Sequence, residues 1–311
     1  MTAIVERHEI TSREAWLELR KQDVTASTIG ALFNCHPYTT VLKLYAEKRG
    51  TEFVVEDNAA MRRGRWLEPA VAKAVEEMRP EWQLIPAKQY LRDPELKLGA
   101  TPDFYIKGDP RGEAICQTKT VAPSVYARDW AGGVEVPLWI ILQASVEAML
   151  ANASFIVIAA LLVDAHNMDV SIHEMPRNLA AEQKIREAVV QFWRNVDRGI
   201  EPEPDFARDA DVIKAMWRRE SEPVRMIDLS GNNAFGHLLA ERAILKDGIK
   251  SAAARCEDIE SQLRYAMKDA AAVTGLDGWR ITYKTSHFKE YTVAARDARV
   301  LRIMDHREKQ T

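Results

Sequence analysis

The chain has 311 residues and a formal net charge of −3, with 47% hydrophobic and 29% charged residues. This composition is ordinary for a soluble globular protein, and the length allows one large domain or two smaller ones. The mildly acidic total does not indicate a nucleic-acid binder, although a local basic groove could bind nucleic acid without a basic total.

The cysteines and the N-terminal residues indicate the cellular compartment that we expect for the protein. Cys35, Cys116 and Cys256 lie far apart and match no disulfide, zinc or iron–sulfur spacing. No eighteen consecutive residues are apolar, and no basic stretch followed by an apolar core opens the sequence. We therefore expect a cytoplasmic protein without a membrane span or secretory signal.

The first 80 residues carry the spacing of four helices, at 12–23, 25–35, 40–50 and 57–79. Ser12 is the N-cap candidate of the first, Thr25 or Ser27 that of the second, and Gly50 ends the third. Strand-like segments follow at 83–91, 97–107 and 113–121, with 107–113 as a hairpin turn.

The next segments complete an α/β pattern. A helix is expected at 137–153, a continuous apolar strand at 154–163, an alternating strand at 168–175 and a helix at 179–199. The proline-rich stretch 199–211 is the best boundary candidate. We therefore predict one domain over residues 1–205 and a C-terminal extension over 206–311.

The extension has a different pattern. Apolar residues between 245 and 270 alternate in steps of four and three, which predicts a long helix at about 233–272 with a heptad seam. This seam could pack on the domain or on a helix formed by 233–244, or it could serve oligomerisation. Residues 278–286 read as a strand that pairs with 289–295 in a short β-hairpin.

A polar group interrupts the first hairpin. Asp103 is expected near the end of one strand, with Gln117 and Lys119 on one face of the next and Thr118 on the opposite face. Carboxylate and amide oxygens can hold a hard divalent cation, which polarises a phosphoryl oxygen and activates a bound water. The Lys119 ammonium could then orient that water or stabilise developing charge.

Two motifs give a family resemblance. "TPD" and "QTK", residues 101–103 and 117–119, resemble the signature of the PD-(D/E)XK nuclease superfamily. "LRKQDVTASTIGALFNCHPYTT", residues 19–40, resembles the opening of the YqaJ-like phage recombinase exonucleases of the lambda exonuclease type. The resemblance covers about 10–205. It implies a restriction-endonuclease-like α/β core, a central mixed sheet flanked by helices.

The resemblance also implies site residues. In the family, an Arg, a Ser and a hydroxyl residue before the Pro-Asp bind the 5′-phosphate of a DNA end, and the matching residues here are Arg20, Ser27 and Thr101. A guanidinium and a helix-start hydroxyl suit a phosphate. Mg²⁺, with Mn²⁺ as an alternative, would be held by Asp103, Gln117, the Thr118 backbone carbonyl and Glu68. Lys119 and Gln143 complete the implied catalytic set.

The implied function is a metal-dependent 5′-to-3′ exonuclease on double-stranded DNA ends. It would leave 3′ single strands for a single-strand annealing protein, in a bacterium or a phage-infected host cell. The resemblance further implies a homo-oligomer, a trimeric ring around DNA. Rival readings are a RecB- or Cas4-like enzyme, whose frequent four-cysteine cluster this chain lacks, and a restriction-type endonuclease.

Candidate DNA contacts flank this set. Arg62, Arg63 and Arg65 precede Glu68 and could bind the phosphate backbone, although a solvated helix face is the alternative. Trp130, in the loop "RDWAGGVEVP", is favoured as a base-stacking residue over Trp66, for which core packing is expected.

Gln117 departs from the family, which usually has Glu at this position. An amide keeps an oxygen but loses the charge, so cation affinity should fall. Three explanations are open: a natural variant in which Glu68 and Asp103 carry the metal, a substitution made to trap a DNA complex, or a DNA-end-binding protein that is weakened or inactive as a nuclease.

Overall fold

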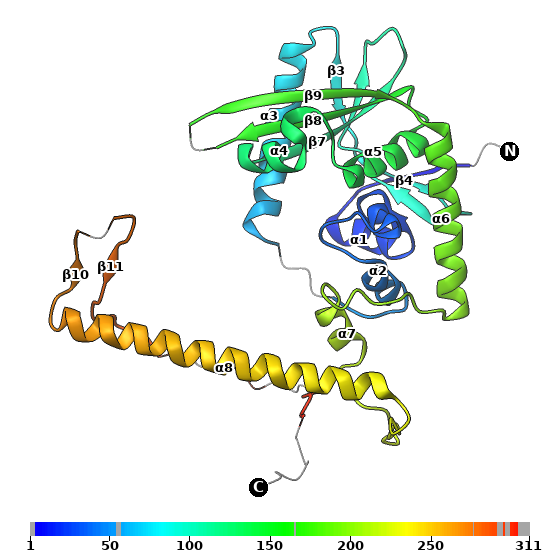
Figure 1. The fold of residues 1–311 in the computed structure, drawn as a ribbon. Helices are drawn as coiled ribbons and strands as arrows, with labels where there is room; N and C mark the ends of the chain where they lie inside the picture. The colour runs from blue at the N-terminus through cyan, green and yellow to red at the C-terminus, as the bar shows by residue number, and fades with distance from the viewer. Residues whose placement is uncertain are drawn as a thin grey trace. The chain divides into compact units, whose positions relative to one another are not determined.

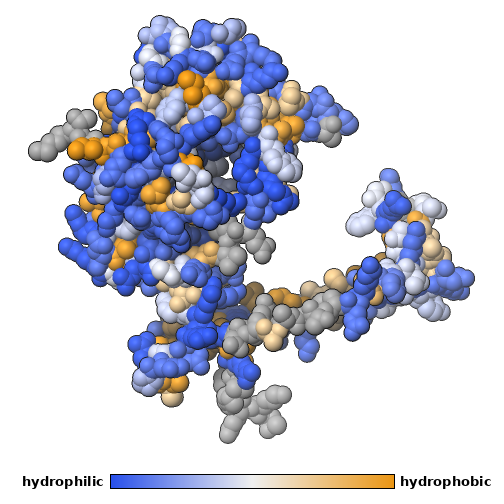
Figure 2. Space-filling model, turned by 180° about the vertical axis from the view of Figure 1, so that it is seen from behind, coloured by the Kyte–Doolittle hydropathy of each residue, from blue (hydrophilic) through white to orange (hydrophobic). Residues whose placement is uncertain are grey.

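The computed structural model describes residues 4–53, 57–164, 166–275, 277–290, 295 and 299–303. By the contacts between its residues, the chain divides into two units, Met1–Trp217 and Arg218–Thr311. Within the described ranges, no helix is both long and apolar enough to cross a membrane. Hydrophobic residues on the surface of the first unit are scattered among hydrophilic ones in the view of Figure 2.

The first unit is built on a five-stranded mixed sheet with the order β3-β6-β7-β8-β9 (Figure 1). Its strands are β3 (Gln83–Pro86), β6 (Phe104–Lys107), β7 (Ala114–Val121), β8 (Phe155–Val163) and β9 (Met168–Pro176). β7 and β8 are parallel, whereas the other neighbouring strands are antiparallel. The predicted fold class, a mixed α/β sheet with flanking helices, is confirmed.

Helices cover both faces of this sheet. α3 (Ala59–Met78) packs Val71 and Val75 on one face, and α5 (Leu138–Ala151) packs Ile140 and Ala144 on the other, where α4 (Pro123–Asp129) also lies. Alternate residues of β8 are buried against each layer, which explains its continuous apolar sequence. α5 is buried on its other side as well, by a third core cluster.

A second sheet has the order β1-β4-β5-β2, from β1 (Glu6–Glu9), β4 (Gln89–Asp93), β5 (Leu98–Ala100) and β2 (Val24–Thr25). The predicted strand at 97–107 is therefore two strands, since β5 belongs to this sheet and β6 to the larger one. The predicted strand at 83–91 divides likewise into β3 and β4. Pro102, which has no N–H to donate to a ladder, lies between β5 and β6, so Thr101 and Asp103 sit where the chain passes from one sheet to the other.

The remaining helices of the first unit follow the predicted caps. α1 (Arg13–Lys21) begins after Ser12, whose hydroxyl accepts from the amide of Ala15. The predicted helix at 25–35 is a 3₁₀ helix, η1 (Ala26–Phe33), which ends at Asn34 in a left-handed conformation. α2 (Val41–Lys48) and α6 (Leu179–Arg198) lie close to the predicted positions.

α7 (Ala210–Met216) belongs to the first unit, because its Val212 packs against Leu42 and Ala46 of α2. The first unit thus ends at Trp217, whereas the proline-rich stretch suggested a boundary at 205. A short 3₁₀ turn, η2 (Ala131–Gly133), follows α4.

The second unit contains one long helix, α8 (Asn233–Met267), and a two-stranded sheet. The helix is continuous, so 233–244 does not form a separate helix that could cover the heptad seam. β11 (Ile281–Thr282) pairs with β10 (Ala272–Val273), whereas the sequence suggested 289–295 as its partner. Residues 291–294 of that predicted partner lie outside the described residues.

Candidate active site

Asp103 is bound to β7 by three donors. Its Oδ2 accepts from the Gln117 side-chain amide at 2.5 Å, from the Thr118 N–H at 2.7 Å and from the Thr118 hydroxyl at 2.8 Å. The β6–β7 ladder ends with Phe104 opposite Cys116, so the carboxylate of the next residue takes the place of a ladder acceptor. Thr118, predicted on the face of β7 opposite to Gln117 and Lys119, therefore also binds Asp103 through its N–H and its hydroxyl.

The hydrogen bonds continue from β7 to α5. The Gln143 Nε2 donates to Gln117 Oε1 at 2.7 Å and to Glu147 Oε1 at 2.9 Å, while the Lys119 Nζ donates to Gln143 Oε1 at 3.2 Å. Gln143 and Glu147 are four residues apart, so they share a face of the helix. Asp103, Gln117, Lys119 and Gln143 are therefore brought together, as expected from the sequence.

The orientation of Gln117 differs from the expectation. Because both hydrogens of the Gln143 amino group have acceptors, Gln117 turns its oxygen toward Gln143 and its amino group toward Asp103. That amino group also donates to the Thr118 carbonyl at 3.2 Å. Both oxygens that were predicted as cation ligands, Gln117 Oε1 and the Thr118 carbonyl, thus accept protein hydrogen bonds here.

Three carboxylates act on the buried amine of Lys119. Burial lowers the pKa of Lys119, while Asp103, Glu147 and Glu68 raise it, in that order. Burial, and then the charge of Asp103, raises the pKa of Glu68 to about 7 and that of Glu147 well above its ordinary range. Burial and the mutual repulsion of the carboxylates therefore both favour their protonated forms.

The predicted phosphate-binding residues lie in the same pocket as these acids. It has a volume of about 330 Å³, and its lining includes Arg20, Ser27, Thr101, Asp103, Glu68, Gln143 and Glu147. The Arg20 Nη2 donates to Ser27 Oγ at 2.8 Å, and its guanidinium lies 4.4 Å from the ring centre of Trp16. The Trp16 indole donates to Thr101 Oγ1 at 3.0 Å. The Arg20 guanidinium and the hydroxyls of Ser27 and Thr101 thus converge beside the carboxylates.

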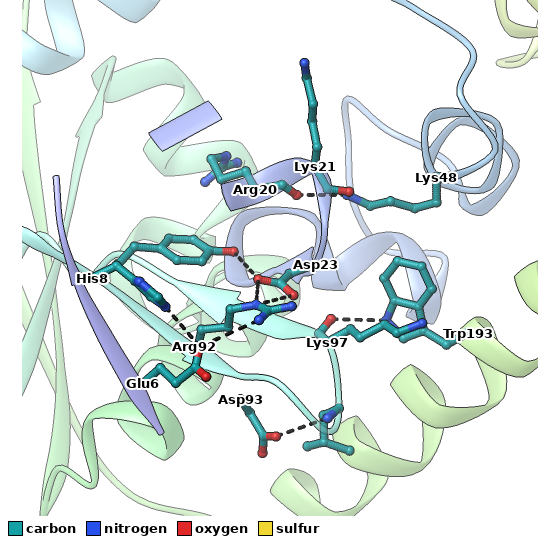
Figure 3. A network of polar contacts seen from close by, with 12 residues as sticks. Glu6, His8, Arg20, Lys21, Asp23, Lys48, Arg92, Asp93, Lys97 and Trp193 are labelled. Atoms are coloured by element: carbon teal, nitrogen blue, oxygen red, sulfur yellow. Dashed lines mark hydrogen bonds and ion pairs between the residues drawn. The ribbon is translucent and has the colours of Figure 1, made fainter. Parts of the chain in front are cut away.

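A network of polar contacts fixes the backbone around Arg20 (Figure 3). The Lys48 Nζ donates to the carbonyls of Arg20 and Lys21 at 3.0 and 3.1 Å, which satisfies the last carbonyls of α1. Asp23, fully buried next to them, accepts from Arg92 and from Tyr90. The end of α1 is therefore held independently of the Arg20 side chain.

The predicted DNA contacts on α3 lie outside the pocket lining. Arg62, Arg63 and Arg65 are exposed; the first donates to the Asp57 carbonyl, the second to the Val163 carbonyl, and Arg65 forms a bidentate pair with the Asp57 carboxylate. Since these groups donate at the protein surface, the structure leaves both predicted readings of the basic run open.

The structure reverses the predicted environments of Trp130 and Trp66. Trp130 is 2% exposed and packs against the rings of Tyr126 and His173, with ring centres 5.4 and 5.5 Å apart. The turn η2 folds its loop back on α4, so Trp130 is a core residue and not an accessible DNA contact. Trp66, expected in the core, is 76% exposed on α3.

Sequence reasoning missed Glu147. It lines the pocket and joins the Asp103 network, and its only signal is a position four residues after Gln143 on an otherwise apolar helix. A buried carboxylate on such a helix is costly without partners.

The donor chemistry of the pocket suits a hard divalent cation. Asp103, Glu68 and Glu147 offer carboxylate oxygens, and Glu147 Oε2 is buried without a hydrogen-bond partner among the described residues. In the described part of the chain, no group of three or more His, Cys, Asp or Glu side chains is arranged as a ready metal site. Binding of a cation would therefore require these side chains to rearrange.

Two solved structures with similar folds are an alkaline exonuclease (LHK-Exo) from Laribacter hongkongensis and a phage related exonuclease from Haemophilus somnus 129PT. The first is 20% identical with a TM-score of 0.48, covering 64% of this chain and 99% of its own, and it has also been solved in complex with dAMP. The second is 15% identical with a TM-score of 0.42, covering 57% and 95%.

A search of curated proteins found no match. The family described as YqaJ-like viral recombinase domain matches residues 15–153, which contain most of α1, the phosphate-binding candidates, both strands of the Asp103 site and α5. This part of the chain is therefore similar to the YqaJ-like viral recombinase domain.

Proposed function

We propose that this protein is a metal-dependent exonuclease that degrades double-stranded DNA from 5′ ends and leaves 3′ single strands. One observation carries the proposal: Arg20, Ser27 and Thr101 line the same pocket as Asp103 and Glu68. A terminal phosphate and a scissile ester one nucleotide away could therefore be held together, which is the arrangement that removal of nucleotides from an end requires.

The 5′-phosphate would be held by the Arg20 guanidinium and the two hydroxyls. A guanidinium presents paired N–H donors that match two phosphate oxygens. Partial burial of Arg20 strengthens such bonds, because water competes less there. Trp16 positions both groups, since its ring lies against Arg20 and its indole N–H binds Thr101.

Asp103, Glu68 and Gln117 would hold Mg²⁺ or Mn²⁺, which polarises a phosphoryl oxygen and lowers the pKa of a bound water. The Thr118 N–H and hydroxyl fix the Asp103 carboxylate in place. Lys119, whose pKa is lowered by burial, is suited to orient a water and to hold a proton at Nζ. Gln143 fixes the Lys119 amine through a bond of 3.2 Å.

A second candidate function is binding of DNA ends without cleavage. The observation that favours it is the Gln117 amino group, which occupies an oxygen of Asp103 where a cation would bind. Under this alternative the pocket still selects 5′-phosphorylated ends, but no nucleotide is released.

The proposed exonuclease function also implies a protein partner and an oligomeric state. The exposed 3′ strand would pass to a single-strand annealing protein, and the active form would be a homo-oligomer, a trimer in the family that the sequence resembles. Light scattering of the purified full chain tests the second feature directly, with a monomer as the contradicting result.

The experiment compares linear duplexes with 5′-phosphate or 5′-hydroxyl ends, in Mg²⁺ and in chelator, with closed circular DNA as control. The exonuclease predicts Mg²⁺-dependent nucleotide release that is faster from phosphorylated ends and absent from circles. Retention of phosphorylated duplexes without digestion would favour the end-binding function, and cutting of circles would contradict both.

A further inference from the structure

Gln117 leaves strand β7 without the negative charge that a cation site would use at that position. α5 brings a carboxylate to the other end of the same hydrogen-bond chain. Asp103 bonds to Gln117, Gln117 to Gln143, and Gln143 to Glu147, at 2.5, 2.7 and 2.9 Å. Glu147 lines the pocket together with Asp103, so the chain of bonds joins two acids of one site.

The environment of Glu147 does not fit a purely structural role. Glu147 is 1% exposed. Its Oε1 accepts one hydrogen bond, from Gln143, whereas its Oε2 has no hydrogen-bond partner in the described structure. An unsatisfied buried carboxylate oxygen destabilises a fold, and a bound ligand would remove that cost. The other buried glutamate among the described residues, Glu182, shows the contrast, because Arg177 donates to both of its oxygens at 2.7 Å.

The charges around Lys119 point the same way. Asp103, Glu147 and Glu68 all act on its amine. If a bound cation kept the three acids ionised and the amine stayed protonated, these four groups would have a net charge of −2, which one divalent cation neutralises. Without Glu147 the cluster would carry only −1, since Gln117 is neutral.

We propose that Glu147, on α5, supplies a negative charge to the cation site. This charge replaces the one that is missing from β7 because Gln117 is neutral. The proposal rests on the cation-dependent nuclease function above and assigns this site one acid that the resemblance does not include. A divalent cation is the ligand, and Glu147 would join Asp103, Glu68 and Gln117 in holding it beside Lys119.

The test measures Mn²⁺ binding to the full chain by isothermal titration calorimetry, without DNA. The variants are Glu147→Gln, Asp103→Asn and the double variant Gln117→Glu/Glu147→Gln, which returns the charge to β7. Glu187→Gln is the matched control, because Gln183 donates to Glu187 across the same four-residue spacing on the exposed face of α6.

The proposal predicts that Glu147→Gln weakens Mn²⁺ binding by about 10- to 100-fold, the range seen when groups supporting a metal site are removed. Returning the charge in the double variant should restore most of the affinity, while Glu187→Gln should bind as the wild type does. Wild-type affinity in Glu147→Gln, or a loss that the double variant does not recover, would overturn the proposal.

The Asp103 variant separates this inference from the proposed function. If Asp103→Asn loses Mn²⁺ while Glu147→Gln retains it, only the role of Glu147 fails. If the wild type itself binds no Mn²⁺, or Asp103→Asn binds it equally well, the cation site and the cation-dependent nuclease fail together.

Thermal unfolding without cation gives a second readout. Replacing a buried, half-satisfied carboxylate by an amide of equal size should leave the melting temperature unchanged or raise it. Addition of Mn²⁺ should then raise the melting temperature of the wild type more than that of Glu147→Gln. A variant that melts earlier without cation and gains as much from Mn²⁺ as the wild type would show that Glu147 is structural.

Discussion

Arg20 offers the sharpest test of how the pocket recognises a DNA end. Its guanidinium donates to Ser27, lies over Trp16 and lines the pocket that holds the acids. Arg20→Gln removes the charge but keeps a donor for Ser27. The α1 backbone should hold, because the Lys48 bonds to its last carbonyls do not involve the Arg20 side chain.

The magnitude follows from the bonds that would be lost. A hydrogen bond to a charged group contributes about 1.5–3 kcal/mol, and every 1.4 kcal/mol is about tenfold. Loss of the guanidinium should therefore lower the preference for a 5′-phosphate over a 5′-hydroxyl end by about 10- to 100-fold. Rates on hydroxyl ends should change little, since no terminal phosphate is present there.

The assay measures kcat/KM on otherwise identical duplexes with the two kinds of end. Arg62→Gln is the control, because this arginine is exposed and lies outside the pocket lining. An Arg20→Gln enzyme that slows equally on both ends, with an unchanged ratio, would refute the assignment of Arg20 to the terminal phosphate.

Three further predictions concern stability and the site. Thr118→Val removes one of three donors to Asp103 and should cost about 1 kcal/mol of unfolding free energy in urea while lowering kcat; unchanged kcat would contradict the role given to Asp103. Trp130→Ala should destabilise the first unit by about 3–5 kcal/mol, whereas Trp66→Ala should stay within about 0.5 kcal/mol, measured by thermal unfolding. Burial raises the folded-state pKa of Glu68 from 4.5 to about 7, so the folded state binds more protons in that window and this contribution to stability is lost as pH rises through it. Glu68→Gln should therefore flatten the decline in urea-unfolding free energy between pH 5 and 8, and an unaltered slope would place Glu68 in a solvated setting.

Local signals in the sequence were sufficient for much of the scaffold. Ser12 caps α1, Asn34 and Gly199 end helices in left-handed conformations, and the apolar run of β8 is buried on both faces. These features depend on residues close in the chain or on simple periodicity. The hairpin spacing also placed Asp103 near Gln117 and Lys119, whereas Gln143 was added to this group by the family resemblance.

The incorrect predictions depend on tertiary contacts that the sequence does not reveal. The segment 97–107 looks like one strand because both halves are apolar, and only the arrangement of two sheets separates β5 from β6. Trp66 and Trp130 sit in patterns that do not reveal which helix face is covered. Glu147 and the orientation of Gln117 depend on which donors and acceptors meet between β7 and α5, across 26 positions of sequence separation.

The most direct test of the central claim follows a linear duplex labelled at its 5′-phosphate or at its 3′ end. Arg20, Ser27 and Thr101 share a pocket with the carboxylates, so the 5′ label should leave first, as a mononucleotide, in Mg²⁺, and Asp103→Asn should retain it. Earlier loss of the 3′ label, or release of the 5′ label by Asp103→Asn at the wild-type rate, would contradict the account.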